Sequence, residues 1–241
     1  MASLLIYINF FIFIVIFALA LTRNSNFNTI LVGFTYLAPL VPFGVNLGNA
    51  DRFLLISYFN LIFGIIEVVV FVITVKPEDT PFNKDHVKQL FGHTLPIVVA
   101  LIGLSFLGRF TEVPVSPIEL SVIIAIFVFG SVMRIVAIYQ IGAAAFKFDI
   151  VFREKQKLKT DQLYGVMRHP SYTAMMIVVI SYALISHSLL FGILGVLSAW
   201  IGFQYRIHHE ERGLAVQFGE EYEVFRSSTG MWIPYRSKRK L

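Results

Sequence analysis

Arg206 and Glu210 are the residues of this chain whose types and spacing best suit ligand binding. They lie four residues apart in a helix-forming stretch, so their side chains share one helix face. A guanidinium can bind a carboxylate through two parallel hydrogen bonds, and a carboxylate can hold an ammonium group. The pair therefore fits a zwitterionic or anionic ligand, although a plain salt bridge at the end of an apolar segment explains the spacing equally well.

Arg168-His169-Pro170 is a second polar group, placed at the start of the same apolar region. Pro170 suits the first turn of a helix, where a missing N–H costs nothing. His169 then lies at a helix N-terminus, where free backbone N–H groups bind anions or polar ligand groups. The alternative is an ordinary helix start with Arg168 against lipid phosphate.

The remaining motif classes are absent or poorly spaced. His208 and His209 are adjacent, so on a helix they point about 100° apart and do not easily share one ion. The other four histidines show no repeated ligand spacing, and the chain contains no cysteine to supply thiolates or disulfides. It also contains no P-loop, no Gly-x-Gly-x-x-Gly and no Gly-x-Ser-x-Gly motif. We expect neither a metal nor a nucleic-acid partner.

The elements that must position these residues are membrane helices. Hydrophobic residues make up 56% of the chain and charged residues 15%, against about 45–50% and about 25% in soluble domains. The sequence therefore predicts an all-α, multi-pass membrane helix bundle of about seven spans. The apolar runs are 4–21, 30–47, 53–75, 93–108, 118–141 and 171–206, the last dividing at Ser186-His187-Ser188 into a hairpin.

Glu67 and Arg134 are charged residues that lie well inside apolar runs. Glu67 is expected to face the bundle interior, because an intramembrane charge is costly unless it is paired or functional. Arg134 either extends to the membrane surface or pairs with another residue. Glu67 is a candidate partner, but the sequence does not place the two together.

The distribution of basic residues predicts the orientation of the bundle. Cytoplasmic loops carry the excess of Lys and Arg. With the N-terminus outside, only Arg52 and Arg109 lie on the outer side and Arg134 lies within a span, while all other Lys and Arg are cytoplasmic. Both ends of the final hairpin and the C-terminus are therefore expected on the cytoplasmic side.

The segment after the hairpin has apolar residues at helical spacing. Leu214, Phe218, Tyr222 and Phe225 alternate with acidic residues, which predicts one amphipathic helix lying on the membrane or on the bundle. The basic tail 236–241 is typical of a segment that contacts anionic membrane lipid.

The C-terminal motifs together resemble the isoprenylcysteine carboxyl methyltransferase family, a group of integral-membrane, S-adenosylmethionine-dependent enzymes related to the phospholipid methyltransferases. The resemblance covers roughly residues 134–234, whereas residues 1–110 show only generic membrane character. The motifs that carry it are Met133-Arg134, Gly142, Leu158, Tyr164, Arg168-His169-Pro170-Ser171-Tyr172, Arg206-Ile207, Glu210-Glu211, Phe218-Gly219-Glu220-Glu221-Tyr222 and Pro234.

This resemblance implies a cofactor pocket for S-adenosyl-L-methionine on the cytoplasmic side, closed by the C-terminal helix. Glu210 is implied to hold the amino group of the cofactor, and Arg206 to face the carboxylate of the substrate. The other residues implied to line the cofactor are Gln156, Lys157, Leu158, Lys159, Tyr164, His169, Pro170, Ser171 and Tyr172.

The chain departs from the family pattern at several positions. Gln162 and Ala174 stand where the family usually has glycine, and Ser228 stands where it often has an arginine. The segment 156–159 lacks the histidine that is common in the family. These differences affect the rim of the implied pocket and leave the identity of the substrate open.

The expected function is methyl transfer to a lipophilic or lipid-attached acceptor, most simply the carboxylate of a prenylcysteine. A carboxylate is already deprotonated at neutral pH, so the site needs only to position and desolvate it. Two alternatives remain: methylation of a phospholipid amine or small thiol, and a non-catalytic lipid-binding or transport protein on the same scaffold. We expect residues 1–110 to form N-terminal spans and residues 111–241 to form the catalytic core.

Overall fold

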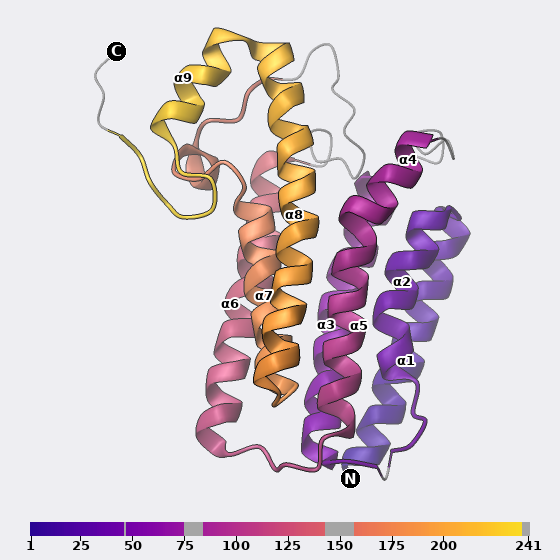
Figure 1. Ribbon diagram of the computed structural model, residues 1–241. Coiled ribbons are helices and arrows are strands. Elements are labelled where there is room, and N and C mark those ends of the chain that lie inside the picture. The colour runs from indigo at the N-terminus through magenta and orange to yellow at the C-terminus, as the bar shows by residue number, and fades with distance from the viewer. Residues whose placement is uncertain (46, 75–83, 143–156, 238–241) are drawn as a thin grey trace.

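A computed structural model of the chain describes residues 1–45, 47–74, 84–142 and 157–237 (Figure 1). The described residues form an all-helical bundle, as the sequence predicts, with only two isolated β-bridges. The elements are α1 (Ala2–Arg23), α2 (Phe27–Leu40), α3 (Ala50–Thr74), α4 (Lys84–Gln89), the π-helical turn η2 (Leu90–Thr94), α5 (Leu95–Phe110), α6 (Pro117–Ile141), the 3₁₀ turn η3 (Gln162–Gly165), α7 (Pro170–Ile185), α8 (Leu189–Phe218) and α9 (Glu220–Ser228).

Within the described residues, seven apolar helical stretches correspond to the seven runs expected from the sequence. Five helical stretches in the described residues are long and apolar enough to cross a membrane: α1, α3, His86–Phe110, α6 and α8. The helices α2 and α7 are apolar but shorter, with 14 and 16 residues. The hairpin divides where expected, since residues 186–188 separate α7 from α8.

Helix α3 lies at the centre of the N-terminal half, where it packs against α1, α2 and α5, while α7 packs between α6 and α8 (Figure 1). Aromatic rings fill the space between these groups. Phe59 on α3 stacks on Phe127 of α6 with ring centroids 3.7 Å apart, and Tyr182 of α7 meets Phe59 edge-on. Residues from α3, α6 and α7 therefore share one core.

Two prolines shape the helices differently from the sequence prediction. The expected run 30–47 is helical only to Leu40, because Val41 precedes Pro42 and adopts the extended backbone that a following proline favours (ψ 121°). Pro96, in contrast, does not break its helix. The π-helical turn η2 comes just before it, and α4, η2 and α5 form one continuous helix.

The single amphipathic helix expected after the hairpin is two helices. Leu214 and Phe218 belong to α8, which runs 30 residues without interruption, whereas Tyr222 and Phe225 belong to α9. The break is at Gly219, whose φ of 52° and ψ of −124° form a combination that glycine adopts more readily than other residues. The turn lets the buried Tyr222 side chain pack back onto the structure.

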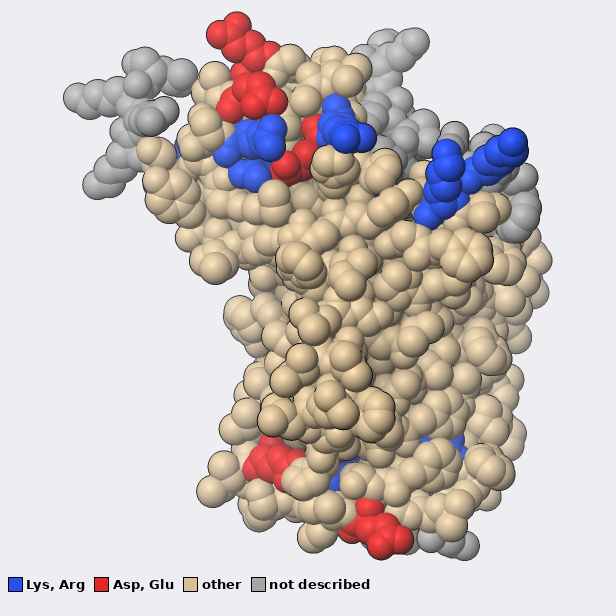
Figure 2. Space-filling model, viewed as in Figure 1, with Lys and Arg blue, Asp and Glu red and all other residues tan. Residues whose placement is uncertain are grey.

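Charged residues gather at the two ends of the bundle. On the face shown in Figure 2, a wide uncharged band separates a group of Lys, Arg, Asp and Glu at the end bearing α4 and α9 from a smaller set of acidic and basic residues at the opposite end. The exposed Lys84 and Lys88 belong to the first group. We call this end the site end and the opposite one the far end. The uncharged band and the apolar helices are those of a multi-pass integral membrane protein.

Candidate functional site

Tyr172, Arg206 and Glu210 form a hydrogen-bonded cluster between α7 and α8. Arg206 Nε donates to Glu210 Oε1 over 2.8 Å and lies 3.2 Å from the hydroxyl oxygen of Tyr172. The Tyr172 hydroxyl donates to the same Glu210 oxygen. Arg206 is 3% exposed, whereas the Glu210 side chain is 23% exposed. The four-residue spacing thus places both charges on one helix face, as predicted.

A second ionic cluster adjoins the first through Glu211. Arg168 Nε donates to Glu211 Oε1 over 2.7 Å, and His169 Nε2 lies 3.2 Å from the same oxygen. His169 Nδ1 lies 3.8 Å from Glu210 Oε2, so the ring of His169 stands between the two carboxylates. Because Arg168 is paired with Glu211, its side chain has a partner within the protein rather than only lipid phosphate.

The helix α7 begins as the sequence predicts. Pro170 occupies its first turn and His169 is its N-cap residue. Pro170 is buried, and the Ser171 hydroxyl accepts a hydrogen bond from Arg134. At the start of α7, Ser171 therefore contacts α6 and Tyr172 contacts α8.

The C-terminal segment 229–237 holds the loop that precedes α7. Its connections are the backbone hydrogen bonds from Arg168 N to Gly230 O, His169 N to Met231 O and Tyr235 N to Val166 O, and the bond from Thr173 Oγ1 to Trp232 O. Arg168 Nη1 also donates to the carbonyls of Arg226 and Thr229. This segment therefore fixes the position of Arg168 and His169 from the side opposite to the membrane helices.

The intramembrane charges Glu67 and Arg134 form a buried pair. Arg134 Nε donates to Glu67 Oε1 over 2.8 Å and Nη2 donates to Glu67 Oε2 over 3.0 Å, and both residues are 4% exposed. Glu67 thus faces the interior as predicted. The guanidinium is paired across the bundle instead of extending to the membrane surface.

The four loop residues implied to line the cofactor have different positions. Gln156 lies outside the described residues. Lys157 is exposed, Leu158 is half-buried, and Lys159 forms an ion pair of 2.7 Å with Asp161, whose pKa is lowered by this contact. None of the contacts described for them joins these three to the Tyr172–Arg206–Glu210 cluster, so their role stays a prediction.

Tyr164 lies on the 3₁₀ turn η3 and is buried against α6. Its hydroxyl is 3.3 Å from the carbonyl oxygen of Ala137, and burial raises its pKa, so the hydroxyl remains a proton donor. Leu163 N donates to Gln140 Oε1. Both contacts attach the turn before α7 to the end of α6.

Aromatic side chains surround Tyr172. Its ring centroid lies 5.8 Å from that of His169, 5.7 Å from that of Phe203 and 6.4 Å from that of His93. Trp232 meets Phe203 edge-on at 6.3 Å. His93 comes from the π-helical turn η2 and lies 3.1 Å from the carbonyl oxygen of Gly202, so Nδ1 is the protonated nitrogen.

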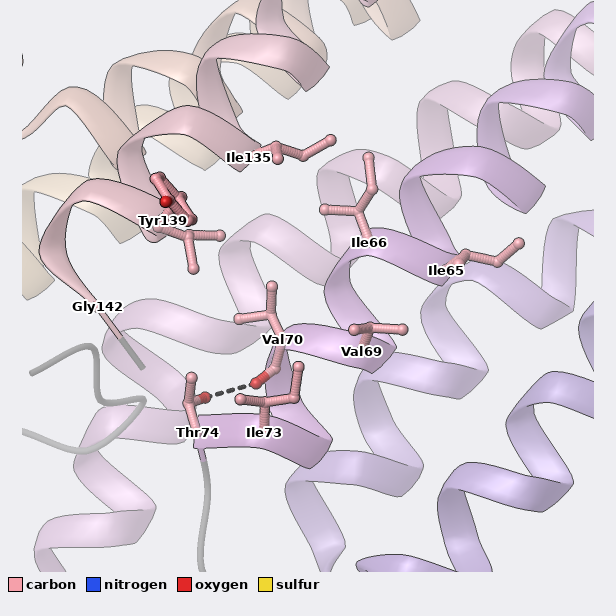
Figure 3. Close-up of a pocket in the computed structure, with 10 residues that line it drawn as sticks. Ile65, Ile66, Val69, Val70, Ile73, Thr74, Ile135, Tyr139 and Gly142 are labelled. Atoms are coloured by element: carbon pink, nitrogen blue, oxygen red, sulfur yellow. Dashed lines mark hydrogen bonds between the residues drawn. The ribbon is translucent and has the colours of Figure 1, made fainter. Parts of the chain in front are cut away.

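An apolar groove of about 570 Å³ opens between α3 and α6 (Figure 3). Ile66, Val70 and Ile73 of α3 face Ile135 and Tyr139 of α6 across it. Ile66 and Ile135 immediately adjoin Glu67 and Arg134 in sequence, so the groove lies beside the buried ion pair. Its lining suits a hydrocarbon chain.

The charged groups of the cluster fit two ligands. One ligand carries an ammonium group, and the other carries a carboxylate. Glu210 Oε2 lies beyond hydrogen-bond distance from His169 and belongs to a part-exposed side chain, so it can accept from an ammonium. Arg206 supplies a planar cation in a nearly water-free setting. No group of three or more His, Asp or Glu suited to a metal is present in the described residues.

Sequence reasoning missed three contributions to this site. Glu211 was part of the motif, but no partner was predicted for it. Its position next to Glu210 could have indicated a place near the site. His93 carried no signal, because its position depends on the π-helical turn. Glu67 was already a candidate partner of Arg134, because an intramembrane charge is costly unless paired, but no sequence signal predicted the link of Arg134 to Ser171.

The central part of the chain matches a known family. Residues 122–216 match the model of the isoprenylcysteine carboxyl methyltransferase (ICMT) family. This range contains Arg134, the start of α7, and both residues of the Arg206–Glu210 pair.

Curated relatives with the same family name were found in plants and yeast. A probable protein-S-isoprenylcysteine O-methyltransferase of Oryza sativa subsp. indica is 28% identical over 109 residues, 45% of this chain and 57% of the relative. Protein-S-isoprenylcysteine O-methyltransferase B of Arabidopsis thaliana is 26% identical over 113 residues, 46% of this chain and 57% of the relative. The Schizosaccharomyces pombe protein-S-isoprenylcysteine O-methyltransferase is 31% identical over 106 residues, 44% of this chain and 45% of the relative. The chain thus spans about half the length of the curated relatives it matches.

A solved structure shares the fold over nearly the whole chain. It is described as the eukaryotic intramembrane Ras methyltransferase ICMT without a monobody, and it matches with a TM-score of 0.56 at 18% identity, covering 97% of this chain and 86% of that one. The resemblance indicated by the motifs is therefore confirmed: residues 122–216 match the model of the isoprenylcysteine carboxyl methyltransferase family, and nearly the whole chain shares the fold of the solved structure.

Proposed function

We propose that this protein is a membrane-embedded methyltransferase that uses S-adenosylmethionine and methylates the carboxylate of a prenylcysteine. The observation that carries the proposal is the buried Arg206, hydrogen-bonded to Tyr172 and Glu210 within the segment that matches the family. The names of the relatives, protein-S-isoprenylcysteine O-methyltransferases, support the same reaction.

Each residue of the cluster has one role in this proposal. Glu210 accepts the ammonium of the methionine part of the cofactor through its exposed oxygen. Arg206 orients the acceptor carboxylate, and Tyr172 fixes the relative position of the two charges. The cofactor, when bound, supplies an electrophilic methyl group on a sulfonium. His169, Pro170 and Ser171 are proposed to line its pocket together with Tyr164 and the loop 156–159.

The surroundings favour a carboxylate over an amine or a thiol as the acceptor. An amine or thiol must lose a proton, and the nearby candidate acceptors are Glu210, Glu211 and His209. Glu210 is hydrogen-bonded to Arg206 and Tyr172, and Glu211 is paired with Arg168 and His169. His209 Nδ1 lies 2.8 Å from the carbonyl oxygen of Tyr205. A carboxylate needs no base. It gains reactivity when it is desolvated and aligned, which the 3% exposure of Arg206 favours.

The groove between α3 and α6 supports a lipid-attached acceptor. It is apolar along its length and lies in helices that are long enough to cross a membrane. We propose that a hydrocarbon chain enters from the bilayer while the polar cofactor enters from the aqueous side.

We also propose that the site end and the C-terminus face the cytoplasm, because Lys and Arg concentrate there. The chain has no cysteine, so single cysteines introduced at the part-exposed Ser188 and Ser237 report each side separately. We expect them to react with impermeant reagents applied from opposite sides, and labelling of both from one side would contradict this orientation.

A substrate screen tests the activity itself. Purified protein in lipid nanodiscs is incubated with S-adenosylmethionine labelled in its methyl group and with prenylcysteine analogues, phospholipids or small thiols. We expect base-labile methyl ester on the prenylcysteine analogue. Label on an amine or a thiol would support the alternative acceptors, and failure both to transfer label and to bind S-adenosylhomocysteine would leave a non-catalytic lipid-binding protein.

A further inference from the structure

The pair Glu67–Arg134 joins α3 to α6 beside the site without contacting Tyr172, Arg206 or Glu210 in any of the contacts described above. Its two parallel hydrogen bonds, of 2.8 and 3.0 Å, hold the guanidinium in one plane. Both side chains are 5% exposed. In such surroundings a charge pair is costly to desolvate, and apolar residues of similar volume often hold two helices together as well.

The third donor of Arg134 reaches a different helix. Nη1 donates to the hydroxyl of Ser171, the second residue of α7. Ser171 directly precedes Tyr172, whose hydroxyl contacts Arg206 and Glu210. One guanidinium therefore connects α3, α6 and the first turn of α7, and apolar side chains in its place could not provide this directional bond.

The same two helices carry a second pair, which serves as an internal comparison. Arg52 on α3 donates to Glu119 on α6 over 2.7 Å. Arg52 precedes Glu67 by 15 residues and Glu119 precedes Arg134 by 15 residues, so the two pairs lie about 22 Å apart along the helices. The charges are exchanged between the helices. The other partners of Arg52 are the carbonyls of Val113, Pro114 and Ile185 and the ring of His187, all at the far end.

We infer that Glu67 and Arg134 are positioning residues for the reaction: they hold the first turn of α7 so that Tyr172 stays against Arg206 and Glu210. The inference rests on the proposed function for its kinetic readout only. It assigns residues 1–110 a part in the site, because Glu67 orients the guanidinium that reaches Ser171.

The main test replaces both charges at once, because removing a single partner would leave a buried charge uncompensated. Glu67→Leu/Arg134→Met is compared with the matched far-end variant Arg52→Met/Glu119→Leu. For the site-end variant we expect turnover to fall about 100-fold, as for a displaced catalytic group. The far-end variant should keep wild-type turnover per folded molecule, whatever its melting temperature.

Ser171→Ala provides the test if the double variant does not fold. It keeps the ion pair and removes only the acceptor on α7, so we expect normal folding, a turnover lowered about ten-fold for one lost charge-assisted hydrogen bond, and an unchanged KM for the acceptor. The turnover of Arg134→Lys should lie between those of wild type and the double variant. Lysine keeps the positive charge but cannot form the two parallel hydrogen bonds of a guanidinium.

Hydrogen exchange measures the same effect without any activity. In nanodiscs, the peptide spanning residues 168–176 should exchange at least about ten-fold faster in Glu67→Leu/Arg134→Met and Ser171→Ala, while Arg52→Met/Glu119→Leu should leave it unchanged. Wild-type exchange in this peptide together with wild-type turnover in the site-end variants would overturn the inference. Faster exchange in the site-end variants, together with a wild-type protein that transfers no methyl group, would instead overturn the proposed function and leave the positioning role standing.

Discussion

The two ends of the bundle both bury arginines, but they surround them differently. At the far end Arg52 meets one carboxylate and three backbone carbonyls. Arg109, which is fully buried, donates to the carbonyl of Pro39 and lies over the ring of Phe53 at 4.1 Å. Backbone carbonyls are fixed by the fold, so these contacts close loops and helix ends.

At the site end, carboxylate side chains dominate. Arg134, Arg168 and Arg206 meet Glu67, Glu211 and Glu210, respectively. A side-chain carboxylate can be oriented by a second group or shared with a ligand, which a backbone carbonyl in a packed loop cannot. Buried arginines in one membrane bundle can therefore serve closure, placement of charge or both, as Arg168 does with one carboxylate and two backbone carbonyls.

The largest effect that would sharpen this comparison is expected from Arg206→Ala. Loss of the cation that orients the acceptor should lower turnover by at least about 100-fold, or about 3 kcal/mol in the activation free energy. Calorimetry should show a much smaller change in affinity for S-adenosylhomocysteine. Glu210→Ala should instead weaken the affinity for S-adenosylhomocysteine directly. Equal affinity in wild type and Glu210→Ala would contradict the assigned roles.

A smaller effect, on the stability of the fold, is expected when alanine replaces either of two glycines with positive φ, one at each end of the bundle. Gly48 at the far end has φ 74°, and an added Cβ would lie 2.5 Å from the carbonyl oxygen of Arg109. Gly219 has φ 52° and open space around it. We expect Gly48→Ala to destabilise the fold by about 2–3 kcal/mol and Gly219→Ala by about 1 kcal/mol. Thermal unfolding in nanodiscs measures both, and equal shifts would show that the far end is no more tightly closed.

The smallest effect is expected from Arg109→Met. The Nε and Nη2 groups of Arg109 have no hydrogen-bond partner among the described residues, although the side chain is fully buried. Replacing an incompletely satisfied buried cation by an apolar side chain of similar length is often neutral or stabilising. We expect the melting temperature to stay constant or to rise, with normal turnover. A strong loss of turnover would break the distinction between the two ends.

Much of the fold was predictable because membrane helices depend on local composition. The existence of an apolar helix in each run, the turn at residues 186–188 and the first turn of α7 at Pro170 follow from single segments, although run 30–47 ends as a helix at Leu40. The division at Gly219 was missed because Leu214, Phe218, Tyr222 and Phe225 continue a helical period across it. Periodicity alone does not reveal a positive φ.

In the candidate site, too, contacts within one helix could be predicted, whereas contacts between helices could not. The pairing of Arg206 with Glu210 follows from local sequence, because both lie on one helix and 3.6 residues per turn fixes their relation. Helix packing, in contrast, brings Glu67 to Arg134 across 67 residues, brings Arg134 to Ser171, and places His93 of the π-helical turn against Tyr172. These contacts join different helices, and their geometry follows from how the helices pack, which no local pattern contains.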